Sequence, residues 1–210
     1  MAVEDRLLIS LGSGPRAPEG WIATDINPTS PEVMTVDLLR PLPFPTESVE
    51  FFHAEQVIEH LDFSEIGALL LEIARCLIPG GVCRIATPDA TRFVDLPRKL
   101  ASDDTDSQDW QDWLVSANRM WGVDERFVND WIFAVNRAFN WWGHRFLLTR
   151  PLLDDLLRTR GFLTEWQVMG ESRFPELRGI ERHGEEGGER QTAMQTMVVD
   201  AIKLNQVVKR

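Results

Sequence analysis

The chain of 210 residues has no tyrosine, and it has only two cysteines, Cys76 and Cys83. Both cysteines stand among apolar residues, which favours buried, reduced thiols in a cytoplasmic protein over a disulfide. The longest apolar run is too short to span a bilayer, so we expect no membrane span. An apolar segment begins within the first six residues, so we also expect no secretory signal peptide.

Positive charge is scarce as well. The chain has 22 lysines and arginines against 33 aspartates and glutamates, which gives a formal net charge of −11. An acidic protein is a poor partner for nucleic acids and anionic membranes, because both attract basic surfaces. The length and the ordinary hydrophobic content of 43% predict one globular domain over residues 1–210.

The first structural feature is an apolar run, Arg6–Leu11, that stops at two glycines, Gly12 and Gly14. This pattern predicts a buried parallel strand that ends in a tight turn, where backbone can approach a ligand closely. A second strand, Trp21–Thr24, ends at Asp25. The connection between the two strands contains prolines and is too short for a full crossover helix. A glycine turn beside a carboxylate predicts a nucleoside-binding site.

Strand and helix patterns then alternate along the chain. This alternation favours an α/β fold with a doubly wound, mostly parallel, seven-stranded sheet. The further predicted strands are Glu32–Val36, Ser48–His53, Val82–Thr87, Phe162–Val168 and Thr196–Ile202, and the predicted helices are Phe63–Ile78 and Thr149–Arg160.

The segment 93–145 does not follow this alternation. It has a helical pattern and holds six of the eight tryptophans, namely Trp110, Trp113, Trp121, Trp131, Trp141 and Trp142. An insertion after the fifth strand lies at the carboxyl ends of the strands, where ligands bind, so we interpret it as a helical cap or lid. The indoles either form the core of this cap, or one or two of them line a substrate pocket.

The segment 12–17, Gly-Ser-Gly-Pro-Arg-Ala, matches the G-x-G-x-x-A pattern of dinucleotide-binding folds. Two features disagree with a dinucleotide. The proline-containing connection leaves little helix to hold a pyrophosphate, and Asp25 comes sooner than the usual ~20 residues after the strand turn. S-adenosylmethionine (SAM) has no pyrophosphate and fits this pattern better.

Five segments together resemble the class I SAM-dependent methyltransferases, and in particular the small bacterial type-11-like group. They occur in the order of that class: Leu8–Pro15, Ala23–Asp25, Val36–Leu38, Glu55–Leu61 and Leu77–Gly81. The resemblance implies a Rossmann-like fold, SAM as the methyl donor and S-adenosylhomocysteine (SAH) as its product. It also implies a bacterial protein that acts on a small-molecule or saccharide substrate.

The resemblance also implies roles for individual residues. The glycine turn would hold the amino-acid part of the cofactor, Asp25 its ribose, and Asp37 with Leu38 its adenine. Ser10 stands where the class often has an acid. The expected cofactor-binding residues are Ser10, Gly12, Ser13, Gly14, Asp25, Ile26, Asp37, Leu38, Glu55 and Gln56.

Methyl transfer to a hydroxyl is helped by a base with a pKa near neutrality. His144, where the cap returns to the sheet, is the preferred base; His53 and Asp89, at strand ends, are the other catalytic candidates. Each of them also has a structural interpretation, which for Asp89 is a helix cap. His60 is expected to have a structural role. His183 is expected either to bind the substrate or to lie on the surface. The spacing of the histidines matches no compact ligand pattern, so we expect no metal.

The leading hypothesis is therefore a SAM-dependent methyltransferase that acts on a small-molecule or glycan-linked acceptor, with oxygen as the expected acceptor atom. Two alternatives remain open on the sequence. One is a nicotinamide- or nucleotide-sugar-dependent Rossmann enzyme, and the other is a non-catalytic binding module with a degenerate methyltransferase fold. A tryptophan-rich cap also allows a homodimer.

Overall fold

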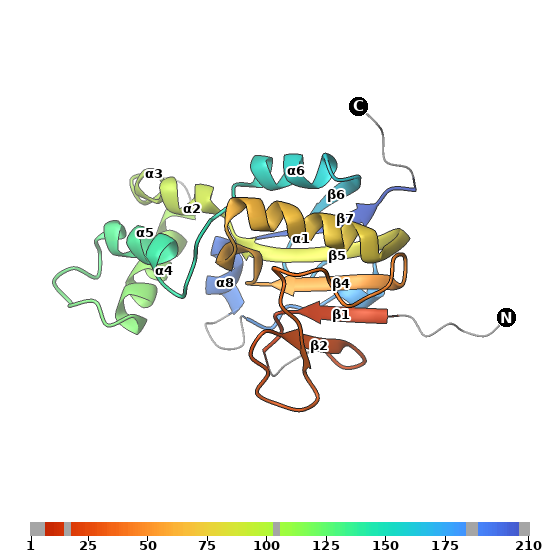
Figure 1. The fold of residues 1–210 in the computed structure, drawn as a ribbon. Helices are drawn as coiled ribbons and strands as arrows, with labels where there is room; N and C mark the ends of the chain where they lie inside the picture. Colours follow the sequence, from red (N-terminus) through yellow and green to blue (C-terminus); the bar gives the residue numbers. More distant parts are fainter. Residues whose placement is uncertain (1–6, 15–17, 103–105, 184–188, 206–210) are drawn as a thin grey trace.

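The computed structural model describes residues 7–14, 18–102, 106–183 and 189–205, without the side chains of residues 189–191. Within these residues one seven-stranded sheet has the order β3-β2-β1-β4-β5-β7-β6. Neighbouring strands are parallel except around β7, which is antiparallel to β5 and β6 (Figure 1). The strands are β1 Leu7–Leu11, β2 Ile22–Asp25, β3 Met34–Thr35, β4 Val49–Glu55, β5 Leu77–Pro88, β6 Phe162–Gln167 and β7 Thr196–Lys203. The expected fold class is confirmed.

The strand order reverses between β1 and β4, because β1 pairs with β2 on one side and with β4 on the other. In open α/β sheets, ligands bind in the crevice beyond the carboxyl ends of the strands at such a reversal. Gly12 follows β1 directly, and Gln56 follows β4. The topology therefore places both segments at the position where a ligand is expected.

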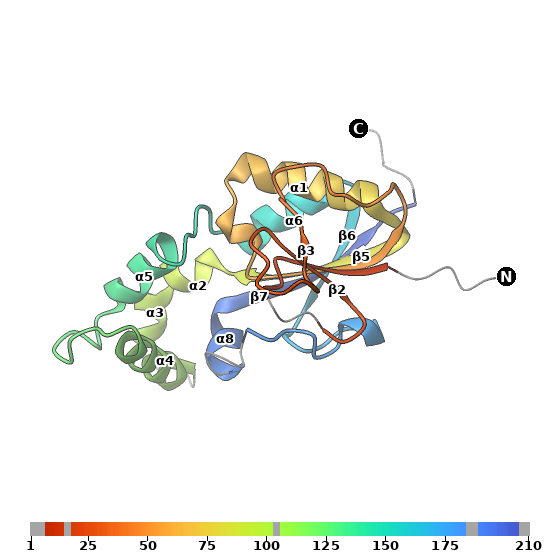
Figure 2. The same ribbon diagram turned by 60° about the horizontal axis from the view of Figure 1, so that its bottom comes forward.

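One face of the sheet is covered by helices α1 (Phe63–Cys76) and α6 (Arg150–Arg158) (Figures 1 and 2). At the start of α1 the Asp62 N–H donates to the Glu65 carboxylate at 2.7 Å, as in a capping box. Both helices bury leucines and isoleucines in the main core: Ile66, Leu69, Leu70, Ile73, Leu153, Leu156 and Leu157.

The opposite face is covered mostly by irregular chain. The segment around the short 3-10 helix η2 (Pro175–Leu177) packs on it, and its Leu177 and Ile180 form a buried cluster with Phe51, Val82 and Ile202. The described part of the connection between β1 and β2 contains no helix. This agrees with the expectation that the connection is too short for a crossover helix.

Four polar side chains form a row across neighbouring strands in the buried part of the sheet. Strand register places Ser10 beside His53, His53 beside Arg84, and Arg84 beside Asp200. The fully buried Arg84 guanidinium forms ion pairs with Asp200, at 2.8 Å, and with Glu181. Through Glu181 it attaches the η2 segment to the sheet.

Most predicted elements differ from the structure by one or two residues at an end, and three differences have a clear structural setting. Helix α1 ends at Cys76 rather than Ile78, because the fully buried Leu77 is extended and pairs with Val49 of β4. The fifth strand accordingly begins at Leu77 and not at Val82. The third strand is only Met34–Thr35, an exposed strand at the sheet edge.

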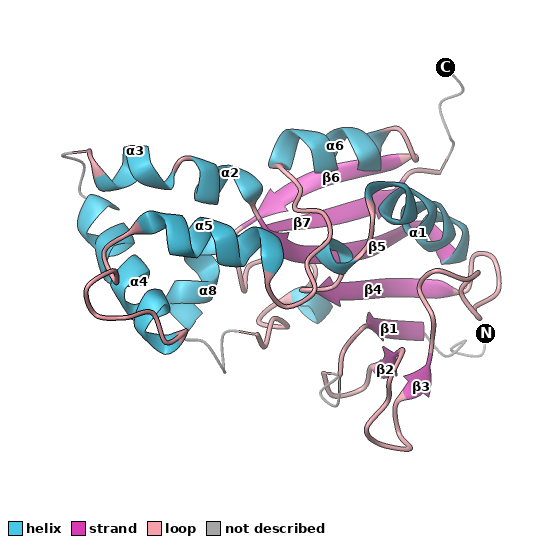
Figure 3. Ribbon diagram, turned by 60° about the vertical axis from the view of Figure 1, so that its left-hand side comes forward, coloured by secondary structure: helices cyan, strands magenta, loops and turns pink. Residues whose placement is uncertain are grey.

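A group of helices lies beyond the carboxyl ends of the strands, after β5 (Figure 3). It has its own buried apolar cluster, which includes Trp110, Trp113 and Leu114 and therefore agrees with the core interpretation of some indoles. The helices are α2 Ala90–Val94, α3 Leu96–Leu100, α4 Asp106–Met120 and α5 Trp131–Asn140. A further short helix, α8 (Glu189–Gln195), directly precedes β7.

Candidate active site

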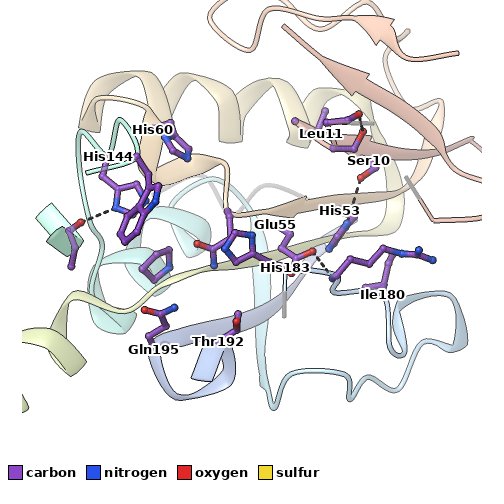
Figure 4. A pocket seen from close by; sticks show the side chains of 18 of the residues that line it. Ser10, Leu11, His53, Glu55, His60, His144, Ile180, His183, Thr192 and Gln195 are labelled. Atoms are coloured by element: carbon purple, nitrogen blue, oxygen red, sulfur yellow. Dashed lines mark hydrogen bonds between the residues drawn. The ribbon is translucent and has the colours of Figure 1, made fainter. Parts of the chain in front are cut away.

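A cavity of about 670 Å³ lies at the carboxyl ends of β1 and β4 and reaches the helices beyond β5 (Figure 4). This volume is in the range of small-molecule sites. Its walls come mainly from the turn after β1, the end of β4, the helices α4 and α5 with the turn that follows, the segment 180–183, and α8, and β2, the segment 58–60, the end of β5 and α2 also contribute. Lining residues include Gly12, Asp25, His53, Glu55, Gln56, His60, Trp113, Trp121, Trp142, His144, Ile180, Thr192 and Gln195.

The turn after β1 depends on its two glycines. Gly12 has a φ of +57° and Gly14 a φ of +56°, a region that residues with a Cβ rarely adopt. The Ser13 N–H donates to the Thr24 carbonyl at 2.9 Å, and the Gly14 N–H donates to Oδ2 of Asp25 at 3.0 Å. The carboxylate predicted to bind a ribose therefore also holds the glycine turn in place.

Substitution of the two glycines is expected to have unequal effects. Either change to alanine costs about 1–2 kcal/mol of stability through the left-handed backbone. A Cβ at Gly12 would also lie 2.7 Å from Cγ2 of Val57, whereas a Cβ at Gly14 would meet no atom within 4 Å. We therefore expect Gly12→Ala to be less stable than Gly14→Ala in urea unfolding. Equal losses would show that Val57 moves aside without cost.

Seven of the ten expected cofactor-binding residues line this cavity: Ser10, Gly12, Ser13, Gly14, Asp25, Glu55 and Gln56. The other three, Ile26, Asp37 and Leu38, are not among its lining residues. The Asp37 carboxylate accepts a hydrogen bond from the Leu39 N–H at 2.9 Å, within its own turn. The fold thus brings the glycine turn and the end of β4 together, while the adenine-binding role of Asp37 and Leu38 stays a prediction.

Glu55 connects the end of β4 to the segment 180–183. Its two carboxylate oxygens accept the N–H groups of Arg182 and His183, each at 2.8 Å (Figure 4). Burial raises the pKa of Glu55, although these two hydrogen bonds oppose that shift. The segment 180–183 is therefore attached to the site at Glu55 and, through Glu181, to Arg84.

His53 is a weak candidate for a base. It is buried, with Nδ1 3.5 Å from the Ser10 hydroxyl, and Nε2 has no hydrogen-bond partner. Burial, and secondarily the charge of Arg84, lowers its pKa to about 3. The ring is therefore neutral near neutral pH and takes up a proton reluctantly, which suits a wall of the cavity better than proton transfer.

This burial predicts a pH effect on stability. Unfolded His53 takes up a proton below its ordinary pKa of 6.5, whereas the folded ring stays neutral down to a pKa of about 3. His53 therefore contributes stability above pH 6.5 that is lost as the pH falls. Between pH 8.0 and 5.5 the loss is about 1 kcal/mol. In urea unfolding, we expect His53→Gln to lose less stability than the wild type over this interval, and the exposed control His183→Gln to match the wild type.

Asp89 is placed as a helix cap. Its carboxylate accepts the Thr91 N–H at 3.0 Å at the start of α2, and it is not among the residues that line the cavity. This geometry favours the capping interpretation of Asp89 over a catalytic one.

His144 lines the cavity and has a defined tautomer. Its Nδ1 lies 2.7 Å from the carbonyl oxygen of Ala138, which can only accept, so Nδ1 carries the hydrogen and Nε2 keeps a lone pair. Burial lowers the pKa of His144. Positive φ angles at Trp142 and Gly143 form the sharp turn that leads from α5 to His144. His144 thus has the chemistry of a proton acceptor or a metal ligand.

Glu59 was not predicted as a site residue. It is fully buried in the short 3-10 helix η1 (Ile58–His60), and its Oε2 accepts the Thr87 hydroxyl at 2.9 Å. Burial raises the pKa of Glu59 to about 7. The pair Glu59-His60 is visible in the sequence, but His144 lies more than 80 positions away, so only the fold shows that the three residues meet.

The sequence allowed one or two cap tryptophans to line a pocket without telling which, and it gave no sign that α8 takes part. Three of the six cap tryptophans, Trp113, Trp121 and Trp142, line the cavity, together with Thr192 and Gln195 of α8. Helical periodicity alone does not tell which indoles face a cavity.

No described helix is long and apolar enough to cross a membrane.

The sheet order, the glycine turn and the carboxylate after β2 define a class I methyltransferase fold, and solved structures agree. A SAM-dependent methyltransferase of Archaeoglobus fulgidus matches with a TM-score of 0.52 at 16% identity over 94% of this chain and 86% of that chain. One from Mesorhizobium loti matches with a TM-score of 0.50 at 13% identity over 95% and 93%. A chain of a Haloferax volcanii complex between a methyltransferase activator and a methyltransferase has a TM-score of 0.51 at 14% identity over 97% and 84%.

The sequence adds a match to a family model. Residues 21–85, from β2 to the middle of β5, match the methyltransferase domain model, whereas no curated protein matches the chain. The fold is that of class I methyltransferases, and this match over residues 21–85 supports SAM-dependent methyl transfer by the chain. It favours the leading hypothesis over the nicotinamide-dependent and the non-catalytic alternatives.

Proposed function

We propose that this methyltransferase transfers the methyl group of SAM to a hydroxyl of a small-molecule or glycan-linked acceptor. The observation that carries the proposal is the continuity of the cavity. It has the glycine turn and Asp25 at one end, and His144 with three tryptophans at the other. A cofactor and an acceptor can therefore meet in one continuous cavity.

The residues present fit SAM. Gly12 and Gly14 leave backbone exposed to the cavity without side chains, and the partly buried Asp25 carboxylate has lone pairs left beyond the two backbone N–H groups that it accepts. Ser10, Ser13, Glu55 and Gln56 complete the proposed binding residues, with Ile26, Asp37 and Leu38 on the adenine side. SAM supplies an electrophilic methyl group on a sulfonium sulfur.

The chain itself would supply alignment, exclusion of water and a place for the acceptor proton. Trp113, Trp121 and Trp142 offer flat apolar surfaces on which a sugar ring or an aromatic ring can pack. Nε2 of His144 offers the lone pair toward which a hydroxyl proton can move. Such positioning favours a hydroxyl acceptor, because a hydroxyl must lose its proton as the methyl group arrives.

We also propose that residues 1–210 form one domain in which residues 93–145 are the cap or lid of the cavity. The buried free thiols of Cys76 and Cys83 fit a cytoplasmic, bacterial protein. Exposed aromatic side chains on the cap, such as Trp131 and Trp141, fit the expectation of a homodimer.

Two experiments test the proposed function. Thermal shift assays with SAH and with NAD should show stabilisation by SAH alone, and stabilisation by NAD alone would overturn the proposal. Isotope labelling then tests the acceptor atom: labelled SAM is incubated with a panel of glycosides and with matched amino sugars. Label in an alkali-stable methyl ether supports oxygen, and label only on the amines overturns it.

A further inference from the structure

We propose that Glu59, His60 and His144 form a binding site for a divalent first-row transition cation at the acceptor end of the cavity. Each of the three side chains offers one ligand atom, and these atoms all lie within 4.8 Å of one another. Figure 4 shows His60 and His144 at the same end of the cavity, and their ring centroids are 5.1 Å apart. The spacing of the histidines in the sequence predicted no metal, but the fold brings His144 next to Glu59 and His60.

Backbone hydrogen bonds hold the two parts of this site together. The N–H groups of Arg145 and Phe146 donate to the Glu59 carbonyl at 2.8 and 3.2 Å. The Arg145 guanidinium also forms ion pairs with Asp62 and Glu65 at the start of α1. The segment that carries His144 is therefore fixed on the 3-10 helix that carries Glu59 and His60, so the cluster does not depend on long, mobile side chains.

The donor atoms have the hydrogen bonding that metal ligands usually have. His144 donates Nδ1–H to the Ala138 carbonyl, which leaves the Nε2 lone pair available to a cation. Thr87 donates to Oε2 of Glu59. Backbone carbonyl and hydroxyl partners of this kind orient metal-binding histidines and carboxylates in many proteins.

A second observation points to a missing ligand. Oε1 of Glu59 is buried and has no hydrogen-bond partner, in a residue with no exposed surface. A buried carboxylate oxygen of this kind is costly unless a cation or a proton satisfies it. Two imidazoles and one carboxylate suit Zn²⁺ and neighbouring transition metals, whereas Mg²⁺ and Ca²⁺ prefer sites made of oxygen atoms.

The position of the site gives it a use, on the assumption that the proposed function holds. His60 and His144 line the cavity, so the coordination positions left free by three protein ligands face the acceptor. A hydroxyl oxygen bound there would have a lowered pKa, and its proton would leave to water in the cavity. His144 would then act through the cation instead of taking the proton itself.

The test is calorimetry on the full chain without an affinity tag, stripped with a chelator and titrated with Zn²⁺, Co²⁺ and Mn²⁺. We expect one site per chain for at least one of these ions. Glu59→Gln, His60→Ala and His144→Ala should each weaken it by about 100-fold or more, since loss of a mere supporting partner already costs about 10–100-fold. His183→Ala is the matched control, because His183 lines the same cavity outside the cluster, and it should bind like the wild type.

Thermal unfolding shows whether each variant is folded, so that a loss of binding is not mistaken for misfolding. The cation should raise the melting temperature of the wild type and of His183→Ala, and it should leave that of folded Glu59→Gln unchanged. No binding of any of the three ions, or binding unaffected by the three ligand substitutions, would overturn the site. SAH titrations of the same samples keep the two proposals apart: SAH binding without metal binding rejects only the metal site.

Discussion

Arg84→Met is expected to lower the free energy of unfolding by about 3–5 kcal/mol, the usual cost of removing one partner from a buried ion pair. Arg84 has no exposed surface, and its guanidinium lies against the buried carboxylates of Glu181 and Asp200. Methionine fills a similar volume but leaves both carboxylates without a counter-ion. Urea unfolding at pH 8 measures the loss.

Two further variants make this result interpretable. Arg84→Met combined with Glu181→Gln and Asp200→Asn removes the orphaned charges and should recover part of the lost stability. Arg98→Ala is the matched surface control, because Arg98 pairs with Asp95 at 3.0 Å but is largely exposed, and exposed pairs contribute about 1 kcal/mol or less. If Arg84→Met were no less stable than Arg98→Ala, the buried network would not hold the η2 segment on the sheet.

Arg84→Met should also affect the cavity. Glu181 directly precedes Arg182 and His183, whose N–H groups bind Glu55 at the end of β4. When Glu181 loses Arg84, this wall of the cavity loses its buried ion pair to the sheet and keeps the hydrogen bonds to Glu55. We therefore expect weaker SAH binding in the folded fraction of Arg84→Met, measured by calorimetry.

Asp25→Ala is expected to weaken SAH binding by about 1–3 kcal/mol, or roughly 5- to 150-fold, because ligand hydroxyls and the Gly14 and Asn27 N–H groups lose their shared acceptor. Asp25→Asn keeps one acceptor oxygen and should fall between alanine and the wild type. Isothermal titration calorimetry with SAH measures all three.

The control for Asp25 is Asp89→Ala. Asp89 also follows a strand, but it caps α2 and is not among the cavity-lining residues, so its loss should leave SAH affinity unchanged. Unchanged affinity in Asp25→Ala would remove Asp25 from the proposed site. A loss of stability without a loss of affinity would show that Asp25 only holds the glycine turn.

Much of the local structure was predictable from the sequence, because it depends on short-range patterns. The apolar run before Gly12, the capping pair Asp62 and Glu65, and the alternation of strands and helices each follow from residues close together in the chain. The glycine turn with Asp25 predicted a nucleoside-type site, and the short connection between the first two strands, together with the resemblance of five segments, predicted SAM. The end of α1 was mispredicted, because strand pairing of Leu77 outweighed the helical pattern.

The sequence by itself determined the glycine turn, the strand-end carboxylates and the apolar faces of the helices, because these features act locally; the resemblance to class I methyltransferases rested on five such segments. Only the tertiary structure decided which distant side chains meet. Strand register placed Arg84 between His53 and Asp200 in the sheet, and the return of the cap placed His144 beside Glu59 and His60. These neighbours are distant in the chain, and their meeting depends on how whole elements pack.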